Sequence, residues 1–266
     1  ASERPGYSAR QATMKSVLRY GLLGLLAYLL FLLLQAPANL ATEQWAKRLP
    51  GLSVQTVGGA AINGFAQGLA WRGMRIDQLQ WNWRPLTLFT GWLEFHLNVD
   101  DPEIRLSGNA AVDAGQHVRL QKLTGRLFLT ELAILAGQPK LPLQGVMEFD
   151  VLDFHLSPDG QPLSASGMIR MLDLRLTLGQ PLMLGDFMAQ MNSADPESIQ
   201  GSIKDNNGPL MLEGAFSLQP DGRYRFNGQA AIRDTENRAL RQAMNLLGPP
   251  DGDGRWTLSF SGVLSR

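Results

Sequence analysis

The chain has 266 residues, of which 44% are hydrophobic, and this is enough to bury the core of one large domain or of two ordinary ones. Its 24 Lys and Arg residues balance 24 Asp and Glu residues, so no overall electrostatic field draws it to nucleic acid. Because the chain contains no cysteine, disulfides, thiolate metal sites and a cysteine nucleophile are excluded.

The first predicted element is a transmembrane helix over residues 20–38. Residues 20–34 are fifteen residues without a charge, and the neutral flank 35–38 adds another turn. At about 1.5 Å per residue, this helix reaches about 30 Å, the thickness of the hydrocarbon core of a bilayer. We expect the anchor to be carried by Tyr20, Leu22, Leu25, Tyr28, Phe31 and Leu34.

The charges that flank this helix predict its orientation. The arm 1–19 carries four basic residues and one acidic residue, a net charge of +3, whereas residues 35–58 carry a net charge of +1. The positive-inside rule keeps the arm in the cytoplasm, with Arg10, Lys15 and Arg19 as its charge flank. The rest of the chain then lies across the membrane, which in a Gram-negative cell is the periplasm.

A cleaved signal peptide is the alternative interpretation of this segment, because such peptides also join a basic region, an apolar region and small residues. Residues 34–38 offer small residues, but the apolar run is at the upper limit for a signal peptide and Pro37 is unfavourable at a cleavage site. After the span, Asn39 is expected to cap a juxtamembrane helix through Arg48, within the segment 39–50.

From residue 51 onward the dominant period of hydrophobicity is two, which is typical of strands with one buried face. The alternation is clear in residues 92–99, 172–178, 223–233 and 255–260. Strands that bury only one face indicate antiparallel rather than parallel pairing. Residues 51–266 are therefore predicted to form a mainly β domain, a curved, predominantly antiparallel amphipathic sheet shaped as a half-open barrel or a sandwich-like structure.

Local signals refine this sheet. Residues 157–160 (Ser-Pro-Asp-Gly) and 219–222 (Gln-Pro-Asp-Gly) each separate two alternating runs and predict hairpin turns. The alternation changes phase between Glu148 and Leu156, so a β-bulge or bend is expected near Val151. Residues 181–207 are the least regular stretch, and they predict a linker at a boundary between sub-sheets or an exposed loop.

One helix is predicted among the strands, from Asp234 to Leu247. Asp234 is expected to cap it, while Leu240 and Met244 belong to its apolar stripe and Gly248 follows its end. We expect this C-terminal helix to cover an open end or face of the sheet.

The sequence contains no established catalytic or metal-binding motif. His96, His117 and His155 are scattered, without the spacing of a metal site. Asp153 and His155 share a strand face, which is compatible with half a metal site or an acid–base pair, although a solvated polar face is the simpler interpretation. Residues 251–254 (Asp-Gly-Asp-Gly) match only part of a calcium loop, which favours a turn. We expect neither catalysis nor a cofactor.

Four of the six tryptophans fall within 22 residues. Trp81 and Trp83 share a strand face with Leu79, so packing in the core is the simplest interpretation. The alternative is an amphipathic groove that receives an apolar ligand or a strand of a partner. The residues predicted for this groove are Trp71, Leu79, Trp81, Trp83, Trp92 and Phe95.

Two segments resemble the type II secretion system protein N family. Residues 68–85 (GLAWRGMRIDQLQWNWRP) have a Trp that ends a strand and a polar step to Arg-Pro, and Gly91 then precedes another alternating strand. Residues 247–262 (LGPPDGDGRWTLSFSG) look like the ending of that family. The resemblance extends over most of the chain, including the short arm and the single anchor, and it offers no catalytic residue to transfer.

The resemblance implies an accessory inner-membrane component of the pathway that exports folded periplasmic proteins through an outer-membrane secretin. Its anchor would contact the bilayer, and its periplasmic domain would meet subunits of the inner-membrane platform or the secretin. The leading hypothesis is a non-catalytic assembly or scaffold subunit. The alternative is a lipid-binding or lipid-transfer protein resembling the AsmA-type family, which also joins an N-terminal anchor to a long curved amphipathic sheet.

Overall fold

The computed structural model describes residues 51–71, 73–135, 140–178, 180–195, 198–234 and 236–263. The predicted arm 1–19, transmembrane helix 20–38 and juxtamembrane helix 39–50 lie outside these residues. Within the described ranges, no helix combines the length and the apolar character needed to span a bilayer.

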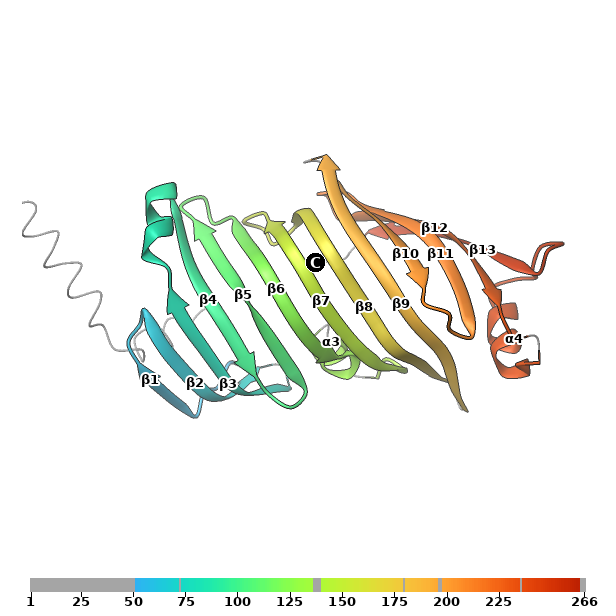
Figure 1. Cartoon of the computed structure of the whole chain (residues 1–266), viewed down its shortest axis with the longest axis horizontal. Helices are drawn as coiled ribbons and strands as arrows, with labels where there is room; N and C mark the ends of the chain where they lie inside the picture. Colours follow the sequence, from blue (N-terminus) through green and yellow to red (C-terminus); the bar gives the residue numbers. More distant parts are fainter. Residues whose placement is uncertain are drawn as a thin grey trace, which may run out of the picture.

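The described chain is built almost entirely from strands, which form a single sheet (Figure 1). The strands are β1 (Thr56–Gly59), β2 (Asn63–Trp71), β3 (Met74–Trp83), β4 (Trp92–Asp100), β5 (Ile104–Asp113), β6 (Val118–Phe128), β7 (Leu143–Leu156), β8 (Pro162–Leu178), β9 (Gln180–Asp195), β10 (Ser198–Asp205), β11 (Leu210–Leu218), β12 (Arg223–Ile232) and β13 (Arg255–Val263). The helices are the 3-10 helix η1 (Pro85–Thr90), α3 (Leu129–Leu135) and α4 (Arg238–Asn245).

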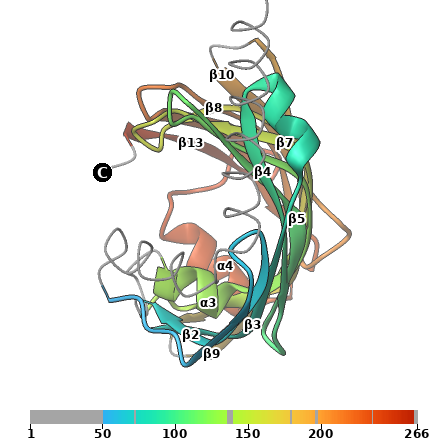
Figure 2. The ribbon, with the colours of Figure 1, turned by 90° about the vertical axis from the view of Figure 1, so that its left-hand side faces the viewer.

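Neighbouring strands in the chain are also neighbours in the sheet, and all the pairs are antiparallel. Figure 2 shows that the sheet curves into an open arc with α3 and α4 inside it, and we call this inner surface the concave face. The predicted mainly β, antiparallel architecture with a C-terminal helix is confirmed. The sandwich-like alternative is wrong, because the thirteen strands form one open sheet rather than two packed sheets.

One apolar residue from every strand lies in a single row across the sheet. Directly paired residues of an antiparallel ladder point to the same face. The row consists of Val57, Ala66, Leu79, Val99, Leu106, Gly125, Phe149, Ile169, Ala189, Ile203, Gly214, Gly228 and Leu258. Ile203 and Leu258 pack with Leu240 of α4, so this apolar row lies on the concave face. The next row along the strands points to the opposite face of the sheet. It is mainly polar and includes Gln80, Asn98, Ser107 and Thr124.

A β-bulge in β7 keeps the apolar residues on the concave face where the sequence changes phase. Val151 pairs with Gly167 and Asp153 pairs with Ser166, so Leu152 has no opposite residue in β8 and is 61% exposed. Gly167 has a φ of +142°, and a Cβ atom there would lie 2.5 Å from the carbonyl oxygen of Asp150. The bulge therefore requires glycine, and the predicted irregularity near Val151 is confirmed.

The predicted turns are also confirmed. The N–H of Gly160 donates to the carbonyl oxygen of Ser157 between β7 and β8, and the N–H of Gly222 donates to that of Gln219 between β11 and β12, both at 2.9 Å. Residues 251–254 form a turn in which Oδ1 of Asp251 accepts hydrogen bonds from the N–H groups of residues 253 and 255. This carboxylate therefore holds the turn.

The C-terminal helix is shorter than predicted and has a different cap. Oδ1 of Asn237 accepts a hydrogen bond from the N–H of Leu240 at 3.0 Å, which makes Asn237 the N-cap of α4. Oδ1 of Asp234 instead accepts from the N–H of Glu236 at 2.9 Å, so Asp234 shapes the turn before the helix. The prediction of Asp234 as the cap is wrong because two polar residues compete there and the helix begins later.

Helices cover the concave face in the middle and at the C-terminal end. Leu240 and Met244 of α4 are buried with Leu174, Phe187 and Trp256. The helix α3, which the sequence pattern did not predict, packs against β6 and β7 near the centre of the sheet. The predicted role of the C-terminal helix as a cover is therefore confirmed for one end of the sheet.

The segment 181–207 is neither a linker nor an exposed loop, because it forms most of β9 and all of β10. Its strand pattern is obscured by a register shift at Gly185, which pairs with Leu174. Before the shift Leu182 pairs with Leu176 of β8, and after it Phe187 pairs with Met171, so apolar residues pair with apolar residues on both sides of Gly185. Gly and Asn are weak strand formers, but pairing with strands on both sides overrides this preference.

Replacing Leu240 by Ala should lower the free energy of unfolding by about 2–5 kcal/mol, because it opens a cavity in the core under α4. Leu246→Ala is the matched control, since Leu246 is 81% exposed and should change stability by less than about 0.5 kcal/mol. Urea unfolding of the full chain in detergent, followed by tryptophan fluorescence, measures both. Equal losses would show that α4 is not part of the core.

Replacing Glu131 by Gln should stabilise the domain at neutral pH. Burial, together with the charge of Glu103 and a hydrogen bond to it, raises the pKa of Glu131 above its usual value. A carboxyl group with a raised native pKa contributes stability below its unfolded pKa, and this contribution is lost as the pH rises through the native pKa. The gain should be up to about 1 kcal/mol at about pH 7 and should vanish near about pH 4.

Thermal unfolding of both proteins across this pH range tests the expectation. Glu236→Gln, in the exposed turn before α4, is the control and should show no such pH-dependent gain. If Glu131→Gln is destabilising at neutral pH, the carboxylate has a favourable partner and the assignment is wrong.

Candidate functional site

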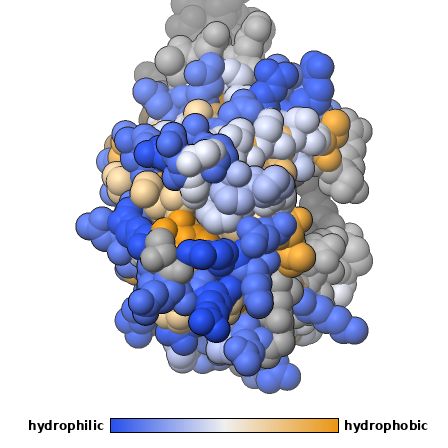
Figure 3. Space-filling model, turned by 90° about the vertical axis from the view of Figure 1, so that its right-hand side faces the viewer, coloured by the Kyte–Doolittle hydropathy of each residue, from blue (hydrophilic) through white to orange (hydrophobic). Residues whose placement is uncertain are grey.

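The concave face stays open at the β3–β6 end, where it forms a groove of about 1120 Å³. Its lining is almost wholly apolar, and Asp113 is the single charged residue among the described residues that line it. Seen from the β13 end, the surface is mainly hydrophilic, with only small apolar areas (Figure 3). The two ends of the molecule therefore differ, and the groove belongs to the end that neither α3 nor α4 covers.

Trp81 forms the floor of this groove and is 2% exposed. Its Nε1–H donates to the carbonyl oxygen of Ala61 at 3.0 Å, which fixes the orientation of the ring. Gly64 is paired with Trp81, and a Cβ atom on Gly64 would lie 2.5 Å from Cζ2 of the indole. Glycine at this position leaves room for the ring, so Trp81 belongs both to the core and to the groove.

The walls combine large and small side chains from three strands. Trp83 pairs with Phe95, and Phe95 pairs with Ala110. Because Ala110 is small, open volume remains beside the phenyl ring. The Nε1 atom of Trp83 is buried, with no hydrogen-bond partner among the described residues.

Asp113 marks the polar edge of the groove, at the end of β5. Its Oδ1 accepts a hydrogen bond from the backbone N–H of His117 at 2.9 Å, and its Oδ2 lies 3.0 Å from Nδ1 of the same residue. Burial raises the pKa of Asp113, but the hydrogen bonds and charge of His117 outweigh it, so the pKa lies below its usual value. The carboxylate is therefore ionised at neutral pH.

The structure brings together four of the six residues predicted for a groove, namely Trp81, Trp83, Trp92 and Phe95. Leu79 lies on the same face beside Trp81 and packs with Ala66 and Leu69, and Trp71 lies at the end of β2; neither residue is part of the lining. Sequence reasoning missed Leu88, Leu93, Leu97, Val112 and Val118. The period-two pattern of residues 104–112 was available and would have found the wall that β5 contributes.

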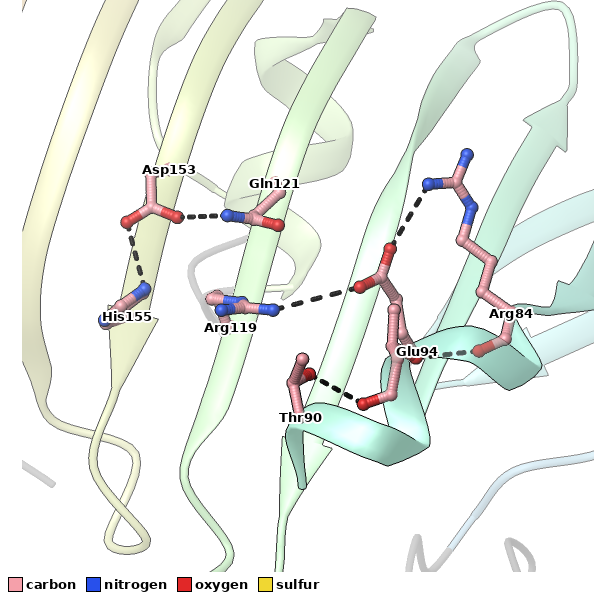
Figure 4. Close-up of polar contacts among 8 residues, drawn as sticks. Arg84, Thr90, Glu94, Arg119, Gln121, Asp153 and His155 are labelled. Atoms are coloured by element: carbon pink, nitrogen blue, oxygen red, sulfur yellow. Dashed lines mark hydrogen bonds and ion pairs between the residues drawn. The ribbon is translucent and has the colours of Figure 1, made fainter. Parts of the chain in front are cut away.

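The opposite, convex face of the same strands carries a buried carboxylate, Glu94 (Figure 4). Its oxygens lie 3.5 Å from Nη1 of Arg84 and 3.8 Å from Nη2 of Arg119. The Arg119 guanidinium also lies 4.3 Å above the ring of Trp92. Glu94 pairs with Ala111, which pairs with Arg119. The small side chain of Ala111 lets Arg119 reach across β5, so this network ties β4 to β6.

Asp153 and His155 also lie on the convex face (Figure 4). Oδ2 of Asp153 is 2.9 Å from Nε2 of His155, while its Oδ1 accepts a hydrogen bond from Nε2 of Gln121 at 2.9 Å. Both residues are partly exposed and lie on the side of the sheet away from the groove. In the described part of the chain, no group of three or more His, Cys, Asp or Glu residues is placed to hold a metal ion. This geometry is that of a polar cluster on a solvated face.

Comparisons with known proteins agree on one family. Curated relatives include type II secretion system protein N of Klebsiella pneumoniae, which is 27% identical over 249 residues, covering 91% of this chain and 94% of the relative. The protein of the same name from Pectobacterium carotovorum subsp. carotovorum is 25% identical over 258 residues, covering 94% and 99%. That from Vibrio cholerae is 26% identical over 264 residues, covering 94% and 100%. No solved structure matches the chain.

A model of the family described as "Type II secretion system (T2SS), protein N" matches residues 50–259, which span nearly the whole described sheet. The chain therefore belongs to the type II secretion system protein N family and is a component of a type II secretion system.

Proposed function

We propose that the chain is a non-catalytic assembly subunit of the type II secretion machinery, anchored in the inner membrane by residues 20–38 with its β domain in the periplasm. The observation that carries this proposal is the open apolar groove at the β3–β6 end. An assembly subunit needs a surface that receives a neighbour, and exposed apolar surfaces of this kind mark interaction sites. The charge asymmetry around residues 20–38 supports the orientation.

The size and the apolar lining of the groove favour a large apolar occupant. Its volume of about 1120 Å³ exceeds the roughly 300–1,000 Å³ of typical small-molecule pockets. Trp83 and Phe95 offer aromatic surface at its centre, and aromatic residues supply much of the binding energy in protein interfaces. The occupant we propose is an apolar segment of another secretion subunit, from the inner-membrane platform or the secretin.

The network on the convex face supports this role by bracing the strands behind the groove. Arg84, Glu94 and Arg119 connect the end of β3, the start of β4 and β6. Because Glu94 is buried, strand movements that separate it from both guanidinium groups would leave its charge without a partner, and this opposes such movements. A rigid wall loses less conformational entropy when an occupant binds.

A second candidate function is lipid binding, and it is favoured by the apolar row that crosses all thirteen strands. An acyl chain needs apolar contact along its length and forms no hydrogen bonds there. The almost wholly apolar lining of the groove provides such contact. In this case the occupant is a lipid rather than a protein segment.

Trp83→Glu should reduce copurification of other secretion subunits with the full chain by at least about tenfold, which is equivalent to about 1.4 kcal/mol. The reason is that an apolar occupant would have to desolvate the new carboxylate in the groove. The control is Asn82→Glu, which places the same charge one residue earlier, where Asn82 pairs with His96 on the polar face. Affinity purification from membranes of the native host, with quantitative mass spectrometry, gives the measurement.

A folding control accompanies these variants. Ala110→Phe fills the groove beside Phe95 without adding a charge, and it should also reduce copurification if thermal unfolding shows that the domain remains folded. Copurification at the wild-type level with a folded, filled groove would rule out the groove as the docking surface.

For the second candidate, native mass spectrometry of the full chain released from gentle detergent should show a retained lipid. Trp83→Glu and Ala110→Phe should both lose that lipid, whereas Asn82→Glu should keep it, because only the first two change the apolar lining. If the wild-type chain retains no lipid, lipid binding is ruled out and the assembly function stands.

A further inference from the structure

The 3-10 helix η1 exposes a group of large apolar side chains beside the groove. Leu86 is 77% exposed, Leu88 is 53% exposed and Phe89 is 90% exposed. Phe89 is the most exposed large apolar side chain in the described part of the chain. Single exposed apolar residues are ordinary, but three on one turn of six residues form a cluster that favours an apolar environment.

Both side-chain hydroxyls of η1 are hydrogen-bonded within the helix itself. The hydroxyl of Thr87 donates to the carbonyl oxygen of Arg84, and the hydroxyl of Thr90 donates to that of Thr87, both at 2.7 Å. The N–H of Gly91 donates to the carbonyl oxygen of Leu88 at 3.0 Å. Pro85 has no N–H group to satisfy. Since unsatisfied polar groups make transfer out of water costly, this turn is suited to leave water.

The charges within η1 and its flanking residues suit a phospholipid surface. Residues 84–93 contain no Asp or Glu, and their one charge is Arg84 at the base of the turn. The Arg84 side chain is about half exposed and is held beside Glu94. An arginine with a long apolar stem next to apolar residues and a tryptophan, here Trp92, is typical of segments at the membrane interface.

The position of η1 brings it within reach of the membrane if residues 20–38 span it. Figure 1 shows η1 at the start of β4, at the same end of the long axis as β1. The segment 39–50 between the predicted span and Gly51 has twelve residues, which reach at most about 40 Å when fully extended. The end of the sheet that carries η1 is therefore tethered near the bilayer.

We propose that η1 is a second membrane contact, in which Leu86, Leu88 and Phe89 enter the interface between the headgroups and the acyl chains. This inference rests on the proposed anchoring of the chain by residues 20–38. Leu88 also lines the groove, so insertion of η1 would hold the mouth of the groove against the membrane surface. An apolar occupant that leaves the membrane would then reach Trp83 and Phe95 without crossing water.

The absence of cysteine from the sequence allows a single probe to be placed at will. In the test, Phe89→Cys carries an environment-sensitive fluorophore, and the full chain is reconstituted into vesicles of mixed zwitterionic and anionic phospholipids. We expect blue-shifted emission, quenching by a spin-labelled lipid and loss of quenching by aqueous iodide. Leu152→Cys, at the exposed bulge of β7, is the matched control and should show the opposite on all three measures.

The outcomes separate this inference from the proposed function. If the chain does not float with the vesicles, the anchoring by residues 20–38 fails. If it floats but the probe at position 89 stays accessible to iodide, η1 does not enter the membrane and the inference is overturned. A probe shielded from iodide but not quenched by the lipid would also overturn it, because η1 would then contact protein.

Discussion

The structure depends on one constraint, which is that all thirteen strands must present their apolar residues to the same face. The side-chain period of a strand is two, so a register slip of one residue would turn the apolar set of a strand toward water. The row from Val57 to Leu258 shows that the constraint is met in every strand. Where the sequence breaks the period, the unpaired residue Leu152, which follows the Val151–Gly167 pair, restores it. The curvature, the core clusters and the groove all follow from this shared face.

The groove is the part of that face that neither α3 nor α4 covers. Toward the C-terminal end, α4 buries Leu240 and Met244 in the largest core cluster, and α3 packs near the centre. At the β3–β6 end, the same kind of surface carries Trp81, Trp83 and Phe95 but remains open. Core and groove are thus a covered part and an open part of one surface. For this reason, the core-packing interpretation and the groove interpretation of the tryptophans are both partly correct. Trp81 is buried, while Trp83 borders open volume.

The sequence predicts most strands and turns because their signals are local. Alternation in residues 223–233 and the turn at residues 219–222 need no knowledge of distant partners. The strands β9 and β10 were missed because Gly185 shifts the phase and their stability comes from neighbours on both sides. The partnership of Glu94 with Arg119 was also hidden, since it depends on the register of β5 and on the small Ala111 between them. Tertiary placement, rather than composition, decides such pairs.

The identity of chain order and strand order has a consequence for how the domain folds. Each strand pairs with the one made just before it, so most ladders form after a short loop closes, and the longer connections before β7 and β13 contain α3 and α4. The sheet can grow by adding hairpins to an edge that is always the most recently formed strand. Growth from β1 keeps that edge moving away from the end that the predicted membrane helix tethers. Among the described strands, β13 lies at the edge of the sheet, and its outer side keeps backbone groups of the kind that every earlier strand uses to pair with its successor.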